Sequence, residues 1–148
     1  MDSYNKVSTK KEVEWTPLGT LTAMEDLIDY FYCVMGTKGL PNSIRYSACE
    51  LILENLYKCG GWIHRANLSL NINQKLTKNG NKPRYSDFDI KKRVAEAHEL
   101  YTETQWQMRM LVKRPELKCR KSRLADLEVI VGKRLGGWLN YVSNRGTR

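Results

Sequence analysis

Four stretches of this 148-residue chain carry apolar side chains at three- and four-residue spacing. That spacing places the side chains on one face of an α-helix, so each stretch predicts an amphipathic helix. Helices of similar length with one apolar face each pack side by side. The sequence therefore predicts an all-α fold, an antiparallel up-down four-helix bundle. The four stripes are Leu21, Met24, Leu27, Ile28, Phe31 and Met35; Ile44, Ala48, Leu51, Ile52, Leu56, Ile63 and Ala66; Ile90, Val94, Ala97, Tyr101, Met108, Leu111 and Val112; and Leu124, Leu127, Val131, Leu135, Trp138 and Val142.

Capping and breaking residues mark where these helices are expected to begin and end. A Ser, Thr, Asp or Asn ahead of an apolar stripe is a good helix start, and Gly or Pro after it is a good stop. The pair Gly60-Gly61 interrupts the second stripe and indicates either a bend or the close approach of a neighbouring helix. The expected starts are Thr20 or Thr22, Asn42 or Ser43, Ser86 or Asp87, and the region of Ser122; the expected stops are Gly36 to Pro41, Pro115 and Gly146.

The chain has the length of a single domain. Residues 1–20 are polar and mixed, and we expect them to form a tail ahead of a bundle domain at 21–148. Residues 67–84 are rich in Asn and contain Asn79-Gly80, a good hairpin turn. Because Leu68, Leu70 and Ile72 also alternate, this segment predicts a long polar loop with one marginal hairpin.

Positive charge is concentrated toward the carboxyl end. Between Lys113 and Arg148 lie ten basic and three acidic residues, whereas the preceding 112 residues carry 15 basic and 13 acidic ones. A segregated basic segment is typical of proteins that bind a polyanion, although a solvated helix face is the alternative. Arg120, Lys121 and Arg123 favour the polyanion, because cations at a helix start oppose the helix dipole and are not placed there for local stability.

No catalytic or metal-binding motif is visible in the sequence. Phosphate-binding glycine loops, nucleophile elbows and metalloprotease motifs are absent, and His64 and His98 lie on different expected helices. The four cysteines form no C-x-x-C pair, so we expect reduced cysteines that pack as small apolar residues. The sequence predicts a protein that is not an enzyme and has no cofactor. Without a long apolar run or an apolar leader, a cytoplasmic protein with no membrane partner is expected.

The last expected helix, residues 124–146, resembles the closing helix of the accessory variability determinant (Avd) proteins of diversity-generating retroelements. The matching residues are Val131, Gly132, Lys133, Leu135, Gly136, Gly137, Trp138 and Arg145. The run from Trp106 to Leu111 is similar to the third helix of that family, with Arg109 at a basic position. A sister family with the same fold is encoded in intervening sequences of ribosomal RNA genes.

The resemblance implies a four-helix bundle that assembles into a ring-shaped homopentamer with a positively charged surface. Such proteins have no catalytic activity. They bind nucleic acid and the reverse transcriptase of the retroelement, and they support error-prone copying of template RNA into cDNA. We therefore expect template RNA or cDNA and a reverse transcriptase as partners. The expected phosphate contacts are Arg109, Lys113, Arg114, Lys118, Arg120, Lys121, Arg123, Lys133, Arg134 and Arg145.

Two other functions fit the same pattern. A protein-interaction adaptor would bind its partner through apolar helix faces and touch no nucleic acid. A small-molecule-binding bundle would need a sizeable internal pocket, whereas the four stripes are adequate only to fill a core. The tryptophans Trp62, Trp106 and Trp138 either stack on bases or belong to the core and subunit contacts, and their helical positions favour the second interpretation.

Overall fold

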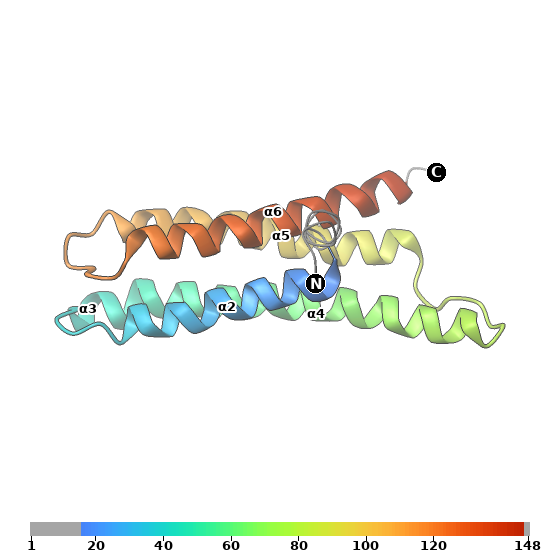
Figure 1. Ribbon diagram of the computed structural model, residues 1–148, viewed down its shortest axis with the longest axis horizontal. Helices are drawn as coiled ribbons and strands as arrows, with labels where there is room; N and C mark the ends of the chain where they lie inside the picture. The colour runs from blue at the N-terminus through green and yellow to red at the C-terminus, as the bar shows by residue number, and fades with distance from the viewer. Residues whose placement is uncertain (1–15, 147–148) are drawn as a thin grey trace, which may run out of the picture.

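The computed structural model describes residues 16–146, and within this range the chain is helical and contains no strand (Figure 1). The predicted all-helical bundle is confirmed, while the expected tail up to residue 15 lies outside the described residues. A three-residue helix, α3, and a π-helix, η1, lead into the second long helix. The elements are α2 (Pro17–Met35), α3 (Asn42–Ile44), η1 (Arg45–Cys49), α4 (Glu50–Lys78), α5 (Asp87–Val112) and α6 (Lys121–Gly146).

The four long helices run antiparallel to their neighbours along the chain (Figure 1). Helix α2 packs against α4 and α6, and α5 packs against the same two helices from the other side. Helix α2 has 19 residues, whereas α4, α5 and α6 have 26 to 29. Within the described residues, α2 begins near the middle of the bundle and so runs beside only part of the length of the other long helices (Figure 1).

The core is built from the predicted stripes, with one exception. Trp138, Tyr101 and Phe31 are its largest side chains and are at most 1% exposed. Leu51, expected in the core, is 48% exposed. The cause is η1, since a π-helix adds a residue to the turn and shifts the side chains that follow. Cys49 takes the core position five residues after Ile44, which turns Leu51 outward.

A buried hydrogen bond joins α5 to α6. The Tyr101 hydroxyl donates to the main-chain carbonyl oxygen of Glu128 over 2.7 Å. Burial also raises the pKa of Tyr101, so the phenol stays neutral and keeps its proton for this bond. Gly132 lies one turn further along α6, and a Cβ built there would meet the Gln105 amide at 3.3 Å. The absence of a side chain at Gly132 therefore allows α6 to approach α5 closely.

Helix α2 begins earlier than expected. The predicted caps were Thr20 and Thr22, but the N-cap is Thr16, whose hydroxyl oxygen accepts from the Gly19 amide over 3.2 Å. Pro17 follows at the first helical position, where its fixed φ suits a helix and its missing N–H costs nothing. Thr20 is a buried residue inside the helix. By contrast, the predicted start of the third helix is confirmed, because Ser86 forms a capping box with Asp89.

The prediction of a loop and hairpin at 67–84 is wrong. Helix α4 continues to Lys78, and the connection to α5 is confined to residues 79–86. The Asn79-Gly80 pair ends the helix instead of turning a hairpin. Gly80 has a φ of 81°, and the Asn81 and Gly80 amides donate to the carbonyl oxygens of Leu76 and Thr77. This pair of bonds is the Schellman arrangement that closes a helix carboxyl end.

Packing on α5 explains why residues 67–78 are helical. Ala66 and Ser69 are buried at helical spacing, and the Arg93 guanidinium of α5 donates to the Ser69 hydroxyl over 2.6 Å. Asn73 holds the returning chain, because its side-chain oxygen accepts from the Arg84 and Tyr85 amides at 2.9 and 3.0 Å. The alternation of Leu68, Leu70 and Ile72 is therefore incidental.

Gly60 and Gly61 do not bend α4. The helix runs through both, and a Cβ at Gly60 would meet the Met24 side chain of α2 at an ordinary contact distance of 3.5 Å, while Gly61 faces open space. Of the alternatives, the bend is ruled out, and only Gly60 faces a neighbouring helix.

No helix among the described residues has the length and apolar content needed to cross a bilayer. The cysteines are all free; Cys49 and Cys59 are buried as expected, whereas Cys33 is exposed and Cys119 is half-buried. Burial raises the pKa of the Cys59 thiol to about 12, so this cysteine is an unreactive core residue.

Candidate nucleic-acid interface

Six of the predicted phosphate contacts lie close together in the chain at one end of the bundle. Residues 113–123, here called the basic segment, include the connection from α5 to α6 and the first turn of α6. The segment contains six basic residues and one acidic residue. All six basic side chains are exposed: Lys113, Arg114, Lys118, Arg120, Lys121 and Arg123.

The backbone of the basic segment is fixed to the bundle. Leu117, in the middle of the connection, is 2% exposed and belongs to the core. The Tyr30 hydroxyl of α2 donates to the Arg120 carbonyl oxygen over 3.2 Å. Within the segment, the Leu117 amide donates to the Arg114 carbonyl oxygen. Cationic side chains therefore extend from a backbone that is already ordered, which lowers the entropy cost of binding.

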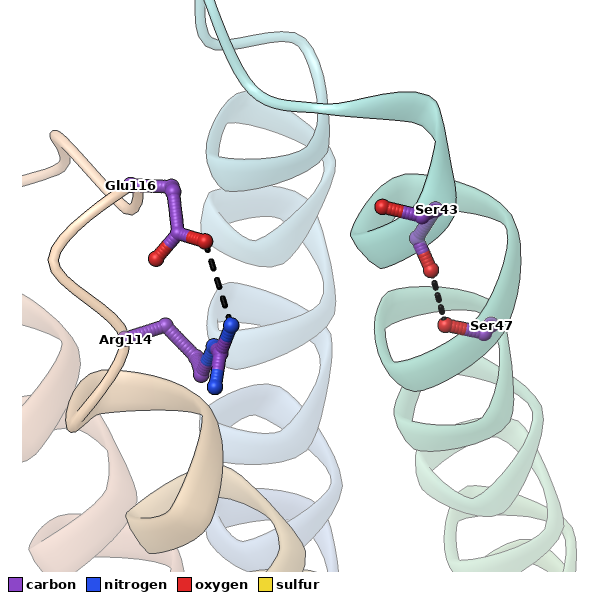
Figure 2. A network of polar contacts seen from close by, with 4 residues as sticks. All are labelled: Ser43, Ser47, Arg114 and Glu116. Atoms are coloured by element: carbon purple, nitrogen blue, oxygen red, sulfur yellow. Dashed lines mark hydrogen bonds and ion pairs between the residues drawn. The ribbon is translucent and has the colours of Figure 1, made fainter.

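One ion pair lies within the basic segment. The Arg114 guanidinium lies 3.1 Å from the Glu116 carboxylate, and both are partly exposed (Figure 2). A main-chain hydrogen bond, aided by Arg114 and Lys118, holds the pKa of Glu116 below its usual value, so the carboxylate stays charged. Figure 2 also shows the Ser47 hydroxyl of η1 donating to the Ser43 carbonyl oxygen of α3. Among the described residues, Arg114 is the one cation of this segment with an acidic partner.

Positive charge at the start of α6 adds to the helix dipole. The first turn of α6 has no acidic residue and contains Lys121 and Arg123, directly after Arg120. Partial positive charge from the unpaired amides of a helix start favours anions at the same place. The combination raises the potential for a phosphate group beyond what the side chains supply.

The other four predicted contacts lie elsewhere or have another role. Arg109 is exposed on the last turn of α5, next to the segment, and opposes the burial that raises the pKa of Glu128. Lys133 is exposed halfway along α6. Arg134 is half-buried and donates to the Gly19 carbonyl oxygen over 2.8 Å, which joins α6 to α2. Arg145 lies 24 residues after Lys121, about 36 Å along the helix.

A second basic region was missed by the sequence analysis. Residues 75–93 contain seven basic and two acidic residues, and they lie at the other end of the bundle, around the connection from α4 to α5. Lys75, Lys78, Lys82 and Arg84 are exposed there. A charge count in short windows would have found this region, whereas a single sum over the first 112 residues conceals it among acidic neighbours.

Acidic residues separate the two basic ends. Between residues 94 and 108, α5 carries Glu96, Glu99 and Glu103 and no basic residue. Helix α2 carries three further acidic residues, Glu25, Asp26 and Asp29. Along α5 the basic residues are therefore confined to the two ends, whereas Arg65 on α4 and Lys133 on α6 are exposed cations between them.

The three described tryptophans differ in burial. Trp138 is buried as expected, but Trp106 is 57% exposed on α5. Trp62 is half-buried on α4, with the Arg65 guanidinium 4.8 Å from the centre of its ring. Met110 and Val129 are further large apolar side chains exposed on α5 and α6, at 46% and 49%. These faces are available to a protein partner or to another subunit.

Within residues 16–146, no three of the His, Cys, Asp and Glu side chains come close enough to hold a metal ion. His64 is exposed on α4 and His98 is half-buried on α5. Lys58 forms an ion pair with Glu54 at 3.4 Å on a solvated face of α4. The protein-family models, curated proteins and solved structures compared with this chain gave no match.

Proposed function

We propose that this protein is a non-catalytic, nucleic-acid-binding accessory protein of a reverse transcriptase in a diversity-generating retroelement. In this proposal it acts in the cytoplasm, binds template RNA or its cDNA together with the polymerase, and supports mutagenic copying. The functional unit is a ring-shaped homopentamer. The similarity of residues 131–145 to the closing helix of Avd proteins supports the family, and the four-helix bundle agrees with the family's fold.

The basic segment is the observation that carries the proposal. Six exposed cations and one carboxylate lie on an anchored connection, where local stability gains nothing from them. Each cation that neutralises a phosphate releases condensed counterions, and this release drives association without reading sequence. Mutagenic copying produces nucleic acids of varying sequence, so an accessory protein in this process should bind phosphates without reading the bases.

The exposed apolar residues of α5 and α6 support the protein partners. Trp106, Met110 and Val129 occupy positions where a monomer gains nothing from large apolar side chains. Subunit contacts or docking of the polymerase would cover them. A second candidate function, a protein-interaction adaptor without nucleic-acid binding, rests on these same residues.

Charge reversal within the basic segment tests the proposal. The triple variant Arg120→Glu, Lys121→Glu and Arg123→Glu places carboxylates where phosphates are expected to bind. We expect retention of single-stranded RNA on a filter at low salt to be abolished. The three side chains are exposed, so the helical circular dichroism spectrum should be unchanged.

A matched control separates location from net charge. The variant Lys75→Glu, Lys78→Glu and Lys82→Glu makes the same change in charge with exposed residues at the opposite end. This variant should retain most of its RNA binding. Equal losses in the two variants would show that total charge, and not the basic segment, is responsible. An unmodified protein that binds no RNA at low salt but captures the polymerase would establish the adaptor instead.

A further inference from the structure

A groove of about 680 Å³ lies at the side of the bundle, next to the start of α2. Among the described residues, its walls come from the last part of α4, the end of α6, the first turn of α5 and the connection that precedes α5 (Figure 1). Sites that hold one small ligand have volumes of about 300–1,000 Å³. The stripes were expected only to fill a core, and this groove lies beside that core.

The floor of the groove is apolar and aromatic. Ile90 of α5 and Trp138 of α6 line it, and both are buried. Tyr85, on the connection from α4 to α5, also lines the groove, and the Arg93 guanidinium packs 4.8 Å from the centre of its ring. An aromatic ring held in place beside an apolar surface can stack on a planar ligand, as such rings do on unpaired bases. This part of the groove therefore fits a flat aromatic group.

The α4 wall of the groove contains a row of side-chain amides. Asn67, Asn71 and Gln74 line the groove at intervals of four and three residues, which places them along one face of the helix. Within the described residues their side chains form no hydrogen bond, whereas both ends of the Asn73 amide hold the returning chain. A side-chain amide both donates and accepts, so this row can pair with the edge of a base. A purely apolar occupant would leave the amides without partners.

Cations lie at the rim of the groove. The amide row continues to Lys78, which follows Gln74 by four residues and is exposed in the second basic region. On the α6 wall, the Arg145 guanidinium donates to the Tyr141 hydroxyl over 2.9 Å. This bond and the nearby Asp87 carboxylate raise the pKa of Arg145, so the guanidinium stays charged. Arg145, a predicted phosphate contact far from the basic segment, thus belongs to this groove.

We propose that the groove binds one unpaired base of the nucleic acid that the basic residues hold. The base lies over the apolar floor beside Tyr85, and its edge pairs with the amides of Asn71 and Gln74. The phosphates that flank this base are attracted to Lys78 and Arg145. Bases stacked in a duplex cannot enter such a groove, so the base comes from a single-stranded stretch. This inference rests on the proposed function and adds a base contact to its phosphate contacts.

Two strands with the same backbone test the proposal on the full chain. One is an unstructured single-stranded RNA, and the other is an abasic strand of equal length that keeps the sugars and phosphates. We expect the RNA to bind about tenfold more tightly at the same salt concentration, because stacking of a base adds to the phosphate contacts. Equal affinity for the two strands would overturn this inference and leave the proposed function intact. Failure to bind either strand would overturn both.

A double substitution locates the base. Asn71→Leu with Gln74→Leu removes two amides of the row, and both residues are exposed, so the helical circular dichroism spectrum should be unchanged. We expect this variant to lose most of the preference for RNA while its affinity for the abasic strand stays the same. The matched control, Asn81→Leu with Asn140→Leu, removes two exposed amides that do not line the groove and should keep the full preference. If the groove variant also keeps the preference, the proposal fails and the groove belongs to another class of ligand.

Discussion

Single side chains decide how the helices of this bundle hold one another and where its cations point. Leu117 fixes the connection from α5 to α6 in the core, so the cations on either side of it are displayed outward. Arg134 shows the reverse case, because its guanidinium is used by the Gly19 carbonyl oxygen. Lys121 and Arg134 both lie on α6, yet Lys121 is exposed and Arg134 is bonded to α2. Their local contacts, and not their charge, set this difference.

Loss of the Tyr101 hydroxyl should weaken the bundle measurably. Tyr101→Phe removes the bond to the Glu128 carbonyl oxygen while keeping the ring, so we expect about 1 kcal/mol less stability in urea unfolding. Tyr46→Phe is the matched control, since Tyr46 is 61% exposed. Equal stability of the two variants would show that the buried bond contributes nothing.

At the scale of elements, the extension of α4 is the main difference between sequence and structure. The apolar stripes placed the four helices correctly because their periodicity depends only on burial of one face. Within residues 67–78 only Ser69 is fully buried and Leu70 is partly buried against the core, so apolar periodicity gave little signal. Contacts from distant residues, above all Arg93 and the chain that returns to Asn73, stabilise this part of the helix.

Asn73→Ala should release the connection between α4 and α5. The variant loses the bonds from the Arg84 and Tyr85 amides and the bond from the Asn73 amide to the Tyr85 carbonyl oxygen at 2.8 Å. We expect a loss of about 1–3 kcal/mol and faster hydrogen exchange at residues 84 and 85. Asn81→Ala serves as the control, because Asn81 bonds to α4 through its main chain. Unchanged exchange in Asn73→Ala would contradict this role.

The candidate site could be predicted in part, because some of its features depend on the sequence alone and others depend on contacts between distant residues. The number and order of charged residues can be read from the sequence, so the basic segment could be identified without a structure. The surroundings of each cation depend on its neighbours in space, so the sequence could not show that Arg134 is half-buried and donates to the Gly19 carbonyl oxygen. The region around Lys75 was concealed in a charge sum over the first 112 residues. The shortness of α2 relative to its partners, and the groove that results, follow from Pro17 and Thr16 only once the other three helices are placed.

At the scale of the whole molecule, the proposed function predicts a steep dependence of RNA binding on salt. Six cations that each neutralise a phosphate of a single strand give a slope of about −4 for the logarithm of affinity against the logarithm of salt concentration. A ring of subunits should make the slope steeper still. The charge-reversed triple variant of the basic segment should have a slope near zero. Affinity that is independent of salt in the unmodified protein would contradict binding through phosphates.

The two basic ends of the bundle have a spacing with a geometric consequence. Lys91 and Lys113, at the two ends of α5, are 22 residues apart, which corresponds to about 33 Å of helix. One turn of a B-form duplex rises by about 34–36 Å. In the proposed function, a duplex parallel to α5 would turn the same groove toward Lys91 and toward Lys113. Half a turn between these two points, it would pass over Glu96, Glu99 and Glu103. In that function, in which the basic segment makes the main contact, a duplex of about one turn is therefore the shortest that would also reach the second basic region.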